Sequence, residues 1–168
     1  MTRVRPGRWL MAVVVSCALC VPAAVAVPVL ALRERTATAT ADARATAATA
    51  ARQAAEAVLS YDYRTVDADI AHARTLATGV FAAQYAESAQ QLAAQAKQTK
   101  AIVQATASEP AVVTASEDAV VVLVFVDQAS VKQLKGDPKP TTRIDQSRVR
   151  LTMTRVHGRW LVSQLAAL

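Results

Sequence analysis

Two histidines, His72 and His157, limit the acid–base chemistry that this 168-residue chain could perform. His72 follows Asp69 by three residues, a spacing that makes the two side chains neighbours on a helix. A carboxylate beside an imidazole could act as a general acid–base couple. We expect both side chains on the solvated side instead, at the edge of the buried stripe that begins at Val66. His157 precedes Gly158 in a predicted turn, and we expect it to be exposed and without a catalytic role.

Nucleophiles and metal ligands are scarce in this sequence. Cys17 and Cys20 are the two cysteines, and their C-x-x-C spacing would suggest redox chemistry in a cytosolic domain. They lie inside a long apolar run, where we expect small packing residues and not thiolates. Two separated histidines without a nearby cysteine make a poor metal site, and no serine or lysine stands in a nucleophile motif. We therefore predict no catalytic residue, no metal site and no cofactor, and an exported part without a disulfide.

The remaining candidates are amphipathic side chains that could line a pocket mouth or a contact surface. Together with the acid–base couple, they give these candidate pocket or contact residues: Tyr61, Tyr63, Asp69, His72, Tyr85 and Trp160. Each of them can equally be a core or rim residue. The seven aromatic residues and four glycines are too few for a stacking surface or for most Gly-rich phosphate loops.

The positive charge is concentrated at the amino end. Residues 1–52 carry seven arginines against two acidic side chains, whereas residues 53–168 carry twelve basic and eleven acidic ones. A nucleic-acid binder needs its basic excess on the folded domain, where it neutralises phosphates. Here the excess flanks an apolar segment, where anionic lipid headgroups would attract it. We therefore exclude nucleic acid as a partner.

Residues 9–32 form an uncharged run of 24 residues, long enough to cross the roughly 30 Å hydrocarbon core as a helix. Three arginines precede the run in residues 1–8, and the two that follow it are partly offset by Glu34. This asymmetry favours a cytoplasmic amino-terminal tail. We predict a single-pass protein of the cell membrane with residues 53–168 on the extracytoplasmic side.

Two processing alternatives stay open for this segment. Ala24-Val25-Ala26 fits an A-x-A cleavage site behind a basic and apolar leader. Cys17, preceded by Val14-Val15-Ser16, loosely matches the acylation site of a lipoprotein. Both alternatives also export residues 53–168.

Residues 33–52 are a low-complexity mixture of alanine, threonine and arginine with no large apolar side chain. Because such a segment cannot build a core, we expect a helical or partly frayed stalk that serves as a spacer.

Three helices and then several strands are expected in residues 53–168. The first helix closes at Leu59, the second covers residues 65–79 with Gly79 as its stop, and the third begins at Phe81. The second helix repeats apolar residues on one face, namely Val66, Ile70, Ala73 and Ala77. The third places these residues on one side: Phe81, Tyr85, either Ser88 or Ala89, and Leu92.

The apolar period changes from 3.6 to 2 after Lys100. Residues 102–103 and 112–113 are short candidate strands, and residues 119–127 are a continuous apolar run that predicts a central strand covered on both faces. Residues 147–156 alternate apolar and polar side chains and join residues 159–165 in a hairpin. Helices followed by antiparallel strands indicate an α+β fold with the helices on one face of the sheet.

The order of these segments resembles the Mce-associated membrane proteins of actinobacteria. The resemblance rests on residues 61–85, 119–128 and 147–165, and it covers nearly the whole chain. It implies three helices on a curved antiparallel sheet, a cone of the nuclear-transport-factor-two-like kind. No catalytic or ligand residue of that family can be carried over.

The resemblance also implies an accessory subunit that assembles or stabilises an Mce-type transport complex, which moves lipids or sterols through the cell envelope. The implied partners are the membrane and Mce-type channel or permease subunits, and self-association stays open. The alternative is a membrane-anchored cone that binds or converts a small ligand.

Overall fold

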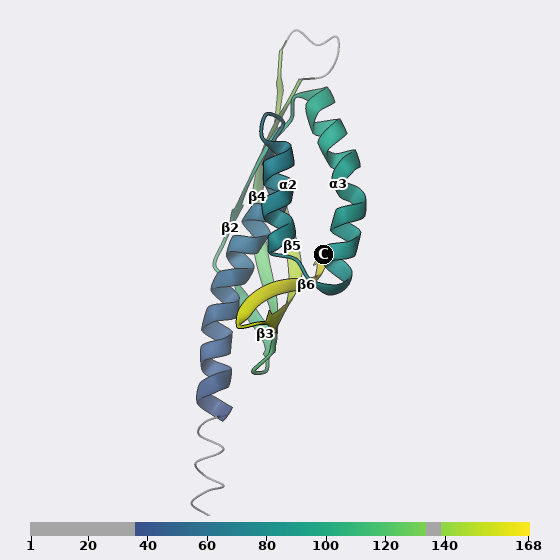
Figure 1. The fold of residues 1–168 in the computed structure, drawn as a ribbon. Coiled ribbons are helices and arrows are strands. Elements are labelled where there is room, and N and C mark those ends of the chain that lie inside the picture. Colours follow the sequence, from purple (N-terminus) through teal and green to yellow (C-terminus); the bar gives the residue numbers. More distant parts are fainter. Residues whose placement is uncertain (1–35, 134–138) are drawn as a thin grey trace, which may run out of the picture. The chain divides into compact units, whose positions relative to one another are not determined.

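The computed structural model describes residues 36–133 and 139–168, which form an α+β fold with helices on a curled antiparallel sheet (Figure 1). Residues 36–59 are helical, and α2 (Val66–Thr75) and α3 (Gly79–Thr99) follow. The strands are β1 (Tyr61–Asp62), β2 (Ile102–Ala107), β3 (Ala111–Ala115), β4 (Ala119–Lys132), β5 (Thr141–Val156) and β6 (Arg159–Ala167). The predicted fold class, three helices on a curved antiparallel sheet, is confirmed at this level.

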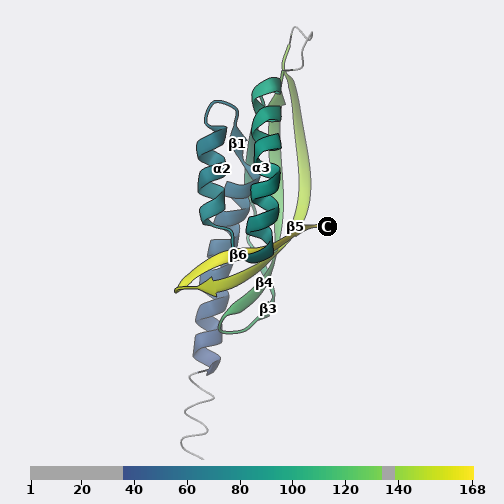
Figure 2. The ribbon, with the colours of Figure 1, turned by 45° about the vertical axis from the view of Figure 1, so that its right-hand side comes forward.

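The six strands form one antiparallel sheet in the order β1-β2-β4-β5-β6, and β3 pairs with β4 beside β2. β4 is the central strand, since it pairs along its length with β5 and on its other side with β2 and β3. Figure 2 shows β6 curling toward the start of α3, where Gly79 lies beside Ser163. The sheet thus wraps around the helices on its inner face.

The inner face of β4 and β5 forms the dry part of the core. Alternate side chains of the two strands are buried there, namely Val120, Val122, Val124, Val126, Val149, Leu151 and Met153. The predicted alternation of residues 147–156 is confirmed. The prediction that residues 119–127 are covered on both faces is wrong, because Phe125 is 49% exposed and its strand neighbours alternate between buried and accessible positions. The helices cover only one side of the sheet, and the outward-facing Val121, Leu123 and Phe125 keep the run apolar without being fully buried.

Alanines of the amino-terminal helix complete the core on the inner face. Ala43, Ala47 and Ala51 are fully buried and belong to the same apolar cluster as Val122 and Leu151. The expectation that residues 33–52 contribute nothing to a core is therefore wrong for this part of the segment. The alanine side chain is small, so the helix can approach the sheet closely. The helix itself then fills the space against the valines of the sheet.

The second and third helices follow their predicted apolar patterns. Val66, Ile70 and Ala73 are the buried residues of α2, and Phe81 and Ala89 are buried in α3. The prediction for Gly79 is wrong in position. It does not stop α2, which ends at Thr75, but is the first residue of α3, with a φ of +56° that favours glycine.

Side chains and loop backbone occupy both outer edges of the sheet. The N–H groups of Ala105 and Ala107 on β2 donate to Ser60 Oγ and Glu56 Oε1, at 2.9 and 3.1 Å. On β6, Val162 exchanges two 2.8 Å backbone bonds with residues 76–78. Unpaired strand edges invite pairing with other chains, and these contacts close the two edges at those positions.

The β5–β6 hairpin turns at His157 and Gly158, whose φ values of +49° and +77° match the predicted two-residue turn. His157 is exposed, as expected. Trp160 follows on β6 and donates from Nε1 to Thr46 Oγ1 at 2.9 Å, while the Arg155 guanidinium lies 5.2 Å from its ring centre. The ring is half-buried against the core cluster and ties the hairpin to the amino-terminal helix.

Trp160→Ala should lower the free energy of unfolding by about 2 to 3 kcal/mol, below the 3 to 5 kcal/mol of a fully buried aromatic, because the ring keeps part of its surface in water. Thr46→Val removes the acceptor for Trp160 Nε1 together with the hydrogen bond from Thr46 Oγ1 to the Asp42 carbonyl, and it should cost about 1 kcal/mol. Denaturant titration of Trp160→Ala measures the whole loss. Titration of Trp160→Phe, Thr46→Val and the double variant tests the hydrogen bond between Trp160 and Thr46. If the two single losses simply add in the double variant, the side chains do not interact.

Several predictions concern residues outside those that the structure describes. These are the basic tail (residues 1–8), the membrane span (residues 9–32), the cysteine pair within it and the loop around Gly136. Among the described helices, none combines the length and the hydropathy that a membrane crossing requires.

Candidate functional site

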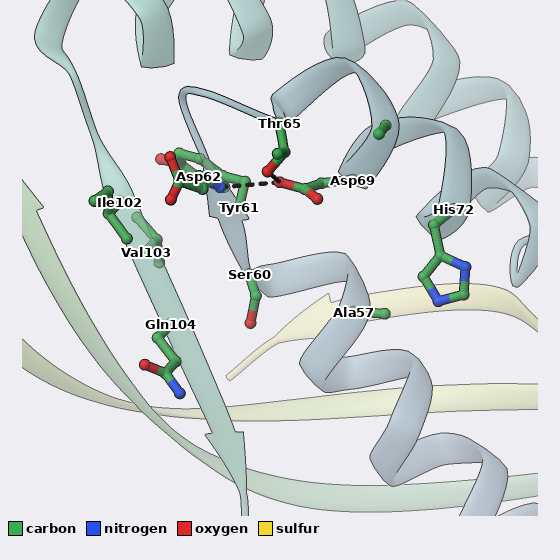
Figure 3. A pocket seen from close by; sticks show the side chains of 11 residues that line it. Ala57, Ser60, Tyr61, Asp62, Thr65, Asp69, His72, Ile102, Val103 and Gln104 are labelled. Atoms are coloured by element: carbon green, nitrogen blue, oxygen red, sulfur yellow. Dashed lines mark hydrogen bonds between the residues drawn. The ribbon is translucent and has the colours of Figure 1, made fainter.

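An open groove of about 450 Å³ lies between the end of the amino-terminal helix, α2 and β2 (Figure 3). Three of the six candidate residues line it: Tyr61 from β1, and Asp69 and His72 from α2. Its other walls include Ser60, Thr65, Val103 and Gln104. The sequence thus indicated one side of this groove and missed the wall that β2 supplies.

Asp69 holds the turn between β1 and α2 together. Its Oδ2 accepts a hydrogen bond from the backbone N–H of Asp62 at 3.0 Å and one from Thr65 Oγ1 at 3.1 Å. Figure 3 shows this carboxylate directed toward Thr65 and the β1 backbone. A carboxylate that anchors a backbone amide has a structural task, since removing it leaves a donor without its partner.

Asp62 and Arg64 form a local ion pair at the rim of the groove. Asp62 Oδ1 accepts from the backbone N–H and from Nε of Arg64, both at 2.9 Å, and Oδ2 accepts from the guanidinium as well. Hydrogen bonding to Arg64 lowers the pKa of the Asp62 carboxyl to about 2. Arg64 is exposed and Asp62 is partly exposed. Because the Asp62 carboxyl is ionised near neutral pH, the pair shapes the turn and does not supply a proton donor there.

His72 lies on the exposed side of α2, next to the groove and away from the Asp69 contacts (Figure 3). In the described part of the chain no hydrogen bond or ion pair joins Asp69 to His72. Asp69 and His72 lie on the same helix, as expected, but the hydrogen bond that would make them an acid–base couple is not formed.

Three tyrosines gather around a second apolar cluster between α2 and α3. Tyr61, Tyr63 and Tyr85 pack against the buried residues Val66 and Ile70. The Tyr85 ring also lies 5.7 Å from that of Phe81, and the Arg64 guanidinium lies 5.9 Å from the ring of Tyr63. Burial raises the pKa of both Tyr61 and Tyr85, and the charge of Asp69 raises that of Tyr85 further. The tyrosines therefore serve as core and rim side chains.

The stability of the domain should fall at alkaline pH because of these two phenols. A tyrosine in the unfolded chain ionises near pH 10, whereas burial keeps Tyr61 and Tyr85 protonated to higher pH in the fold. The stabilising contribution of the two protonated phenols to the free energy of unfolding is therefore complete below pH 10. It is lost as the pH rises through their raised pKa values. Denaturant midpoints measured across this range, with tyrosinate absorbance of the folded protein, check the effect.

Asp69→Asn provides a matched test within the same protein. It should lower the pKa of Tyr85, since the carboxylate charge is removed, without a comparable change for Tyr61. Equal shifts of both phenols, or no shift of Tyr85, would contradict the assigned charge effect.

The sixth candidate, Trp160, lies on β6 against the amino-terminal helix and does not line the groove. Glu56 and Ser60, which seal β2 from the end of that helix, were not singled out in the sequence. Glu56 and Ser60 are four residues apart, about one helical turn. This spacing of two hydrogen-bond acceptors could have indicated that the end of the amino-terminal helix meets backbone N–H groups.

In the part of the chain that the structure describes, no group of three or more potential metal-ligating side chains comes together. The groove offers a few hydrogen-bonding groups beside apolar side chains, which suits contact with a partner or a loosely held amphipathic molecule.

Comparison with known proteins identifies a matching family and relatives in Mycobacterium tuberculosis. The family described as "Uncharacterized protein Rv1363c/MT1408-like" matches residues 9–167. "Outer membrane protein Rv1973" of Mycobacterium tuberculosis is 39% identical over 118 residues, which cover 68% of this chain and 69% of that protein. "Uncharacterized protein Rv1362c" of the same species is 37% identical over 116 residues, and the match covers about half (51%) of its length.

Solved structures share the fold. An IcmL-like type IV secretion system protein from Legionella pneumophila has a TM-score of 0.58 at 19% identity, over 74% of this chain and 91% of that one. The periplasmic domain of DotI has a TM-score of 0.54 at 18% identity, over 72% and 91%. At this level of identity the likeness shows a common architecture.

Proposed function

This chain belongs to the Rv1363c/MT1408-like family, and from that premise we propose that it is a non-catalytic accessory subunit of the cell envelope. In this proposal a single membrane span at residues 9–32 places the amino-terminal tail in the cytoplasm and residues 53–168 outside. The subunit assembles or stabilises an Mce-type complex for lipid or sterol transport. The resemblance of residues 61–85, 119–128 and 147–165 to Mce-associated membrane proteins supplies the finer part of the proposal.

Two comparisons support an envelope location. A relative at 39% identity carries the name outer membrane protein, and a structure with the same architecture is a periplasmic domain. We infer an association with a membrane complex, as in the secretion system to which the IcmL-like structure belongs. We also propose that residues 53–168 form a domain of the nuclear-transport-factor-two-like kind.

The bonding of Asp69 is the observation that supports a non-catalytic role most directly. Its carboxylate accepts from the Asp62 amide and the Thr65 hydroxyl, so the acid that could have partnered His72 holds the β1–α2 turn. A catalytic carboxylate needs to reach the proton that it transfers, and this one is committed to the fold.

The alternative is a domain that binds or converts a small ligand in the 450 Å³ groove. The observation that favours it is the meeting of Tyr61, Asp69 and His72 along one wall. The groove is open to solvent, whereas small-molecule sites usually enclose most of the ligand surface. We therefore rank this function second.

Affinity isolation of the full-length chain from detergent-solubilised membranes of its host tests the first function. We expect Mce-type permease or channel subunits to co-purify, and their amounts to fall in cells that lack this chain. Isolation without any of these subunits, together with unchanged amounts of them in the deletion strain, would contradict the proposal.

His72→Ala should leave both the co-purification and the transport phenotype unchanged, because the ring is exposed and bonds to no other described side chain. Asp69→Asn keeps an acceptor for the turn and serves as the matched variant. Loss of function in either variant, with unchanged thermal unfolding, would favour the ligand-binding alternative.

A further inference from the structure

The outer face of the sheet, opposite the helices, carries an apolar strip beside two arginines. The strip consists of Val121, Leu123 and Phe125 on β4, and Arg148 and Arg150 stand next to it on β5. We call these five residues the phenylalanine–arginine patch. In the register of the two strands Phe125 lies opposite Arg148 and Leu123 opposite Arg150, so each arginine is adjacent to an apolar side chain.

The patch is accessible, although Val121 and Leu123 are half-buried. Phe125 is 49% exposed, and both arginines are exposed. In the described part of the chain neither arginine takes part in an ion pair. Beside Phe125 and Arg148 lies a hollow of about 370 Å³, which Asp127 and Gln146 also line. The patch therefore combines an aromatic side chain and unpaired guanidinium groups, and the depression beside it is lined mainly by polar side chains.

The face is also the part of the sheet most open to a partner. Glu56 and Ser60 occupy the edge of β2, and residues 76–78 occupy the edge of β6 at Val162. At β3 a register shift lies between Val112 and Thr114, and such irregularities disfavour pairing with an added strand. A partner would therefore bind to side chains of the outer face and not to the backbone of a strand edge.

We propose that the phenylalanine–arginine patch docks a protein whose surface places carboxylates opposite Arg148 and Arg150 and an apolar side chain over Phe125. The inference rests on the proposed accessory role, since it names the surface through which such a subunit would bind. Aromatic and arginine side chains are enriched among the residues that carry binding energy at protein interfaces. Their meeting on one exposed face is what supports a protein partner.

Charge complementarity selects this partner over two others. A second copy of the chain, docked through the same face, would bring four arginines together with only the two Asp127 carboxylates, and the excess of like charge in such an interface opposes binding. Anionic membranes attract clusters of about four to eight basic residues, whereas the phenylalanine–arginine patch has two. An acidic and apolar protein surface satisfies both features of the patch.

Photo-crosslinking in the host membrane tests the proposal with the full-length chain. The photoreactive residue p-benzoylphenylalanine replaces Phe125 in one variant and Val80 in a control, since Val80 is 60% exposed on α3. We expect a single protein adduct from position 125, at a yield several times that from position 80. The mass of the adduct identifies the bound molecule.

Charge reversal then tests the role of the arginines. R148E together with R150E should reduce the adduct from position 125 about tenfold, because repulsion replaces attraction at two contacts. R148K with R150K should retain most of it. The control pair R52E with R74E makes the same charge change at exposed helix positions and should leave the yield unchanged. Circular dichroism of each purified variant verifies that it is folded.

Several results would overturn the docking surface. These are a yield at position 125 no higher than at position 80, an adduct of two copies of this chain, an adduct of lipid mass, and a protein adduct that survives R148E with R150E. The two proposals fail separately. If transport subunits co-purify but position 125 gives no adduct, only the docking surface is wrong. If position 125 gives a charge-dependent adduct with a protein of another system, only the Mce-type partner is wrong.

Discussion

Val122→Asp should yield no folded protein. Val122 lies in the middle of the central strand with no exposed surface. It is the cross-strand neighbour of Leu151 and belongs to the same apolar cluster as the alanines of the amino-terminal helix. A carboxylate at this position would have to lose its hydration without a partner, at an effective cost of several kcal/mol. That cost is comparable to the whole stability of a small domain. Circular dichroism and proteolysis of the purified variant measure the loss of structure.

Phe125→Asp is the matched control on the same strand. Phe125 faces the opposite side and is 49% exposed, so a carboxylate there remains hydrated. This variant should fold with at most a small loss of stability. A folded Val122→Asp protein, or equal damage from both substitutions, would contradict the one-sided core described for β4.

Removal of residues 40–52 should have the second largest effect. A chain that begins at residue 53, the predicted domain boundary, would lose the buried side chains of Ala43, Ala47 and Ala51 together with the Trp160–Thr46 bond. The inner face of the sheet would then be uncovered where these alanines pack. We expect loss of cooperative unfolding and exposure of apolar surface, because the remaining helices cannot close the core.

The comparison uses two soluble fragments, residues 40–168 and residues 53–168, studied by thermal unfolding and by binding of a hydrophobic dye. The longer fragment should unfold in one cooperative step, and the shorter one should bind the dye without a sharp transition. Equal midpoints for the two fragments would show that the alanine segment is the spacer that its composition suggests.

Periodicity in the sequence was sufficient to predict most of the elements. The stripe at Val66, Ile70 and Ala73 and the alternation around Leu151 each predicted an element and the side of it that is buried. These signals are reliable because large apolar residues leave water wherever a surface is available to cover them.

The errors in predicting the fold share one cause: the missing information is tertiary. Residues 119–127 are apolar on both sides of β4, but only contact with the helices decides which side is buried. Ala43 and Ala47 show little hydrophobicity, and their burial depends on the sheet that they meet. Gly79 can end one helix or begin the next, and the three-residue connection that pairs with β6 determines which.

The spatial arrangement of the candidate residues could be predicted only in part, because the missing information is again tertiary. Tyr61, Asp69 and His72 come together because they are close in sequence, around one turn. Trp160 could not be placed relative to them, since its partner Thr46 lies 114 residues away in the chain. The patch at Phe125 and Arg148 also required the pairing of two strands, although the alternation in residues 147–156 already placed the arginines opposite the buried side chains.

The buried alanines of the amino-terminal helix recur every four residues, at positions 43, 47, 51 and 55. A helix that slid by one turn, about 5.4 Å, would present nearly the same smooth stripe to the sheet. Apolar packing alone therefore distinguishes poorly between neighbouring alignments. Polar bonds at separate points along the helix make the choice, since a slip would replace Thr46 opposite Trp160 by Ala50 or Asp42 and would withdraw Glu56 and Ser60 from β2. In this domain the alanines provide the apolar packing between the amino-terminal helix and the sheet, and a few hydrogen bonds determine the alignment of the helix along the sheet.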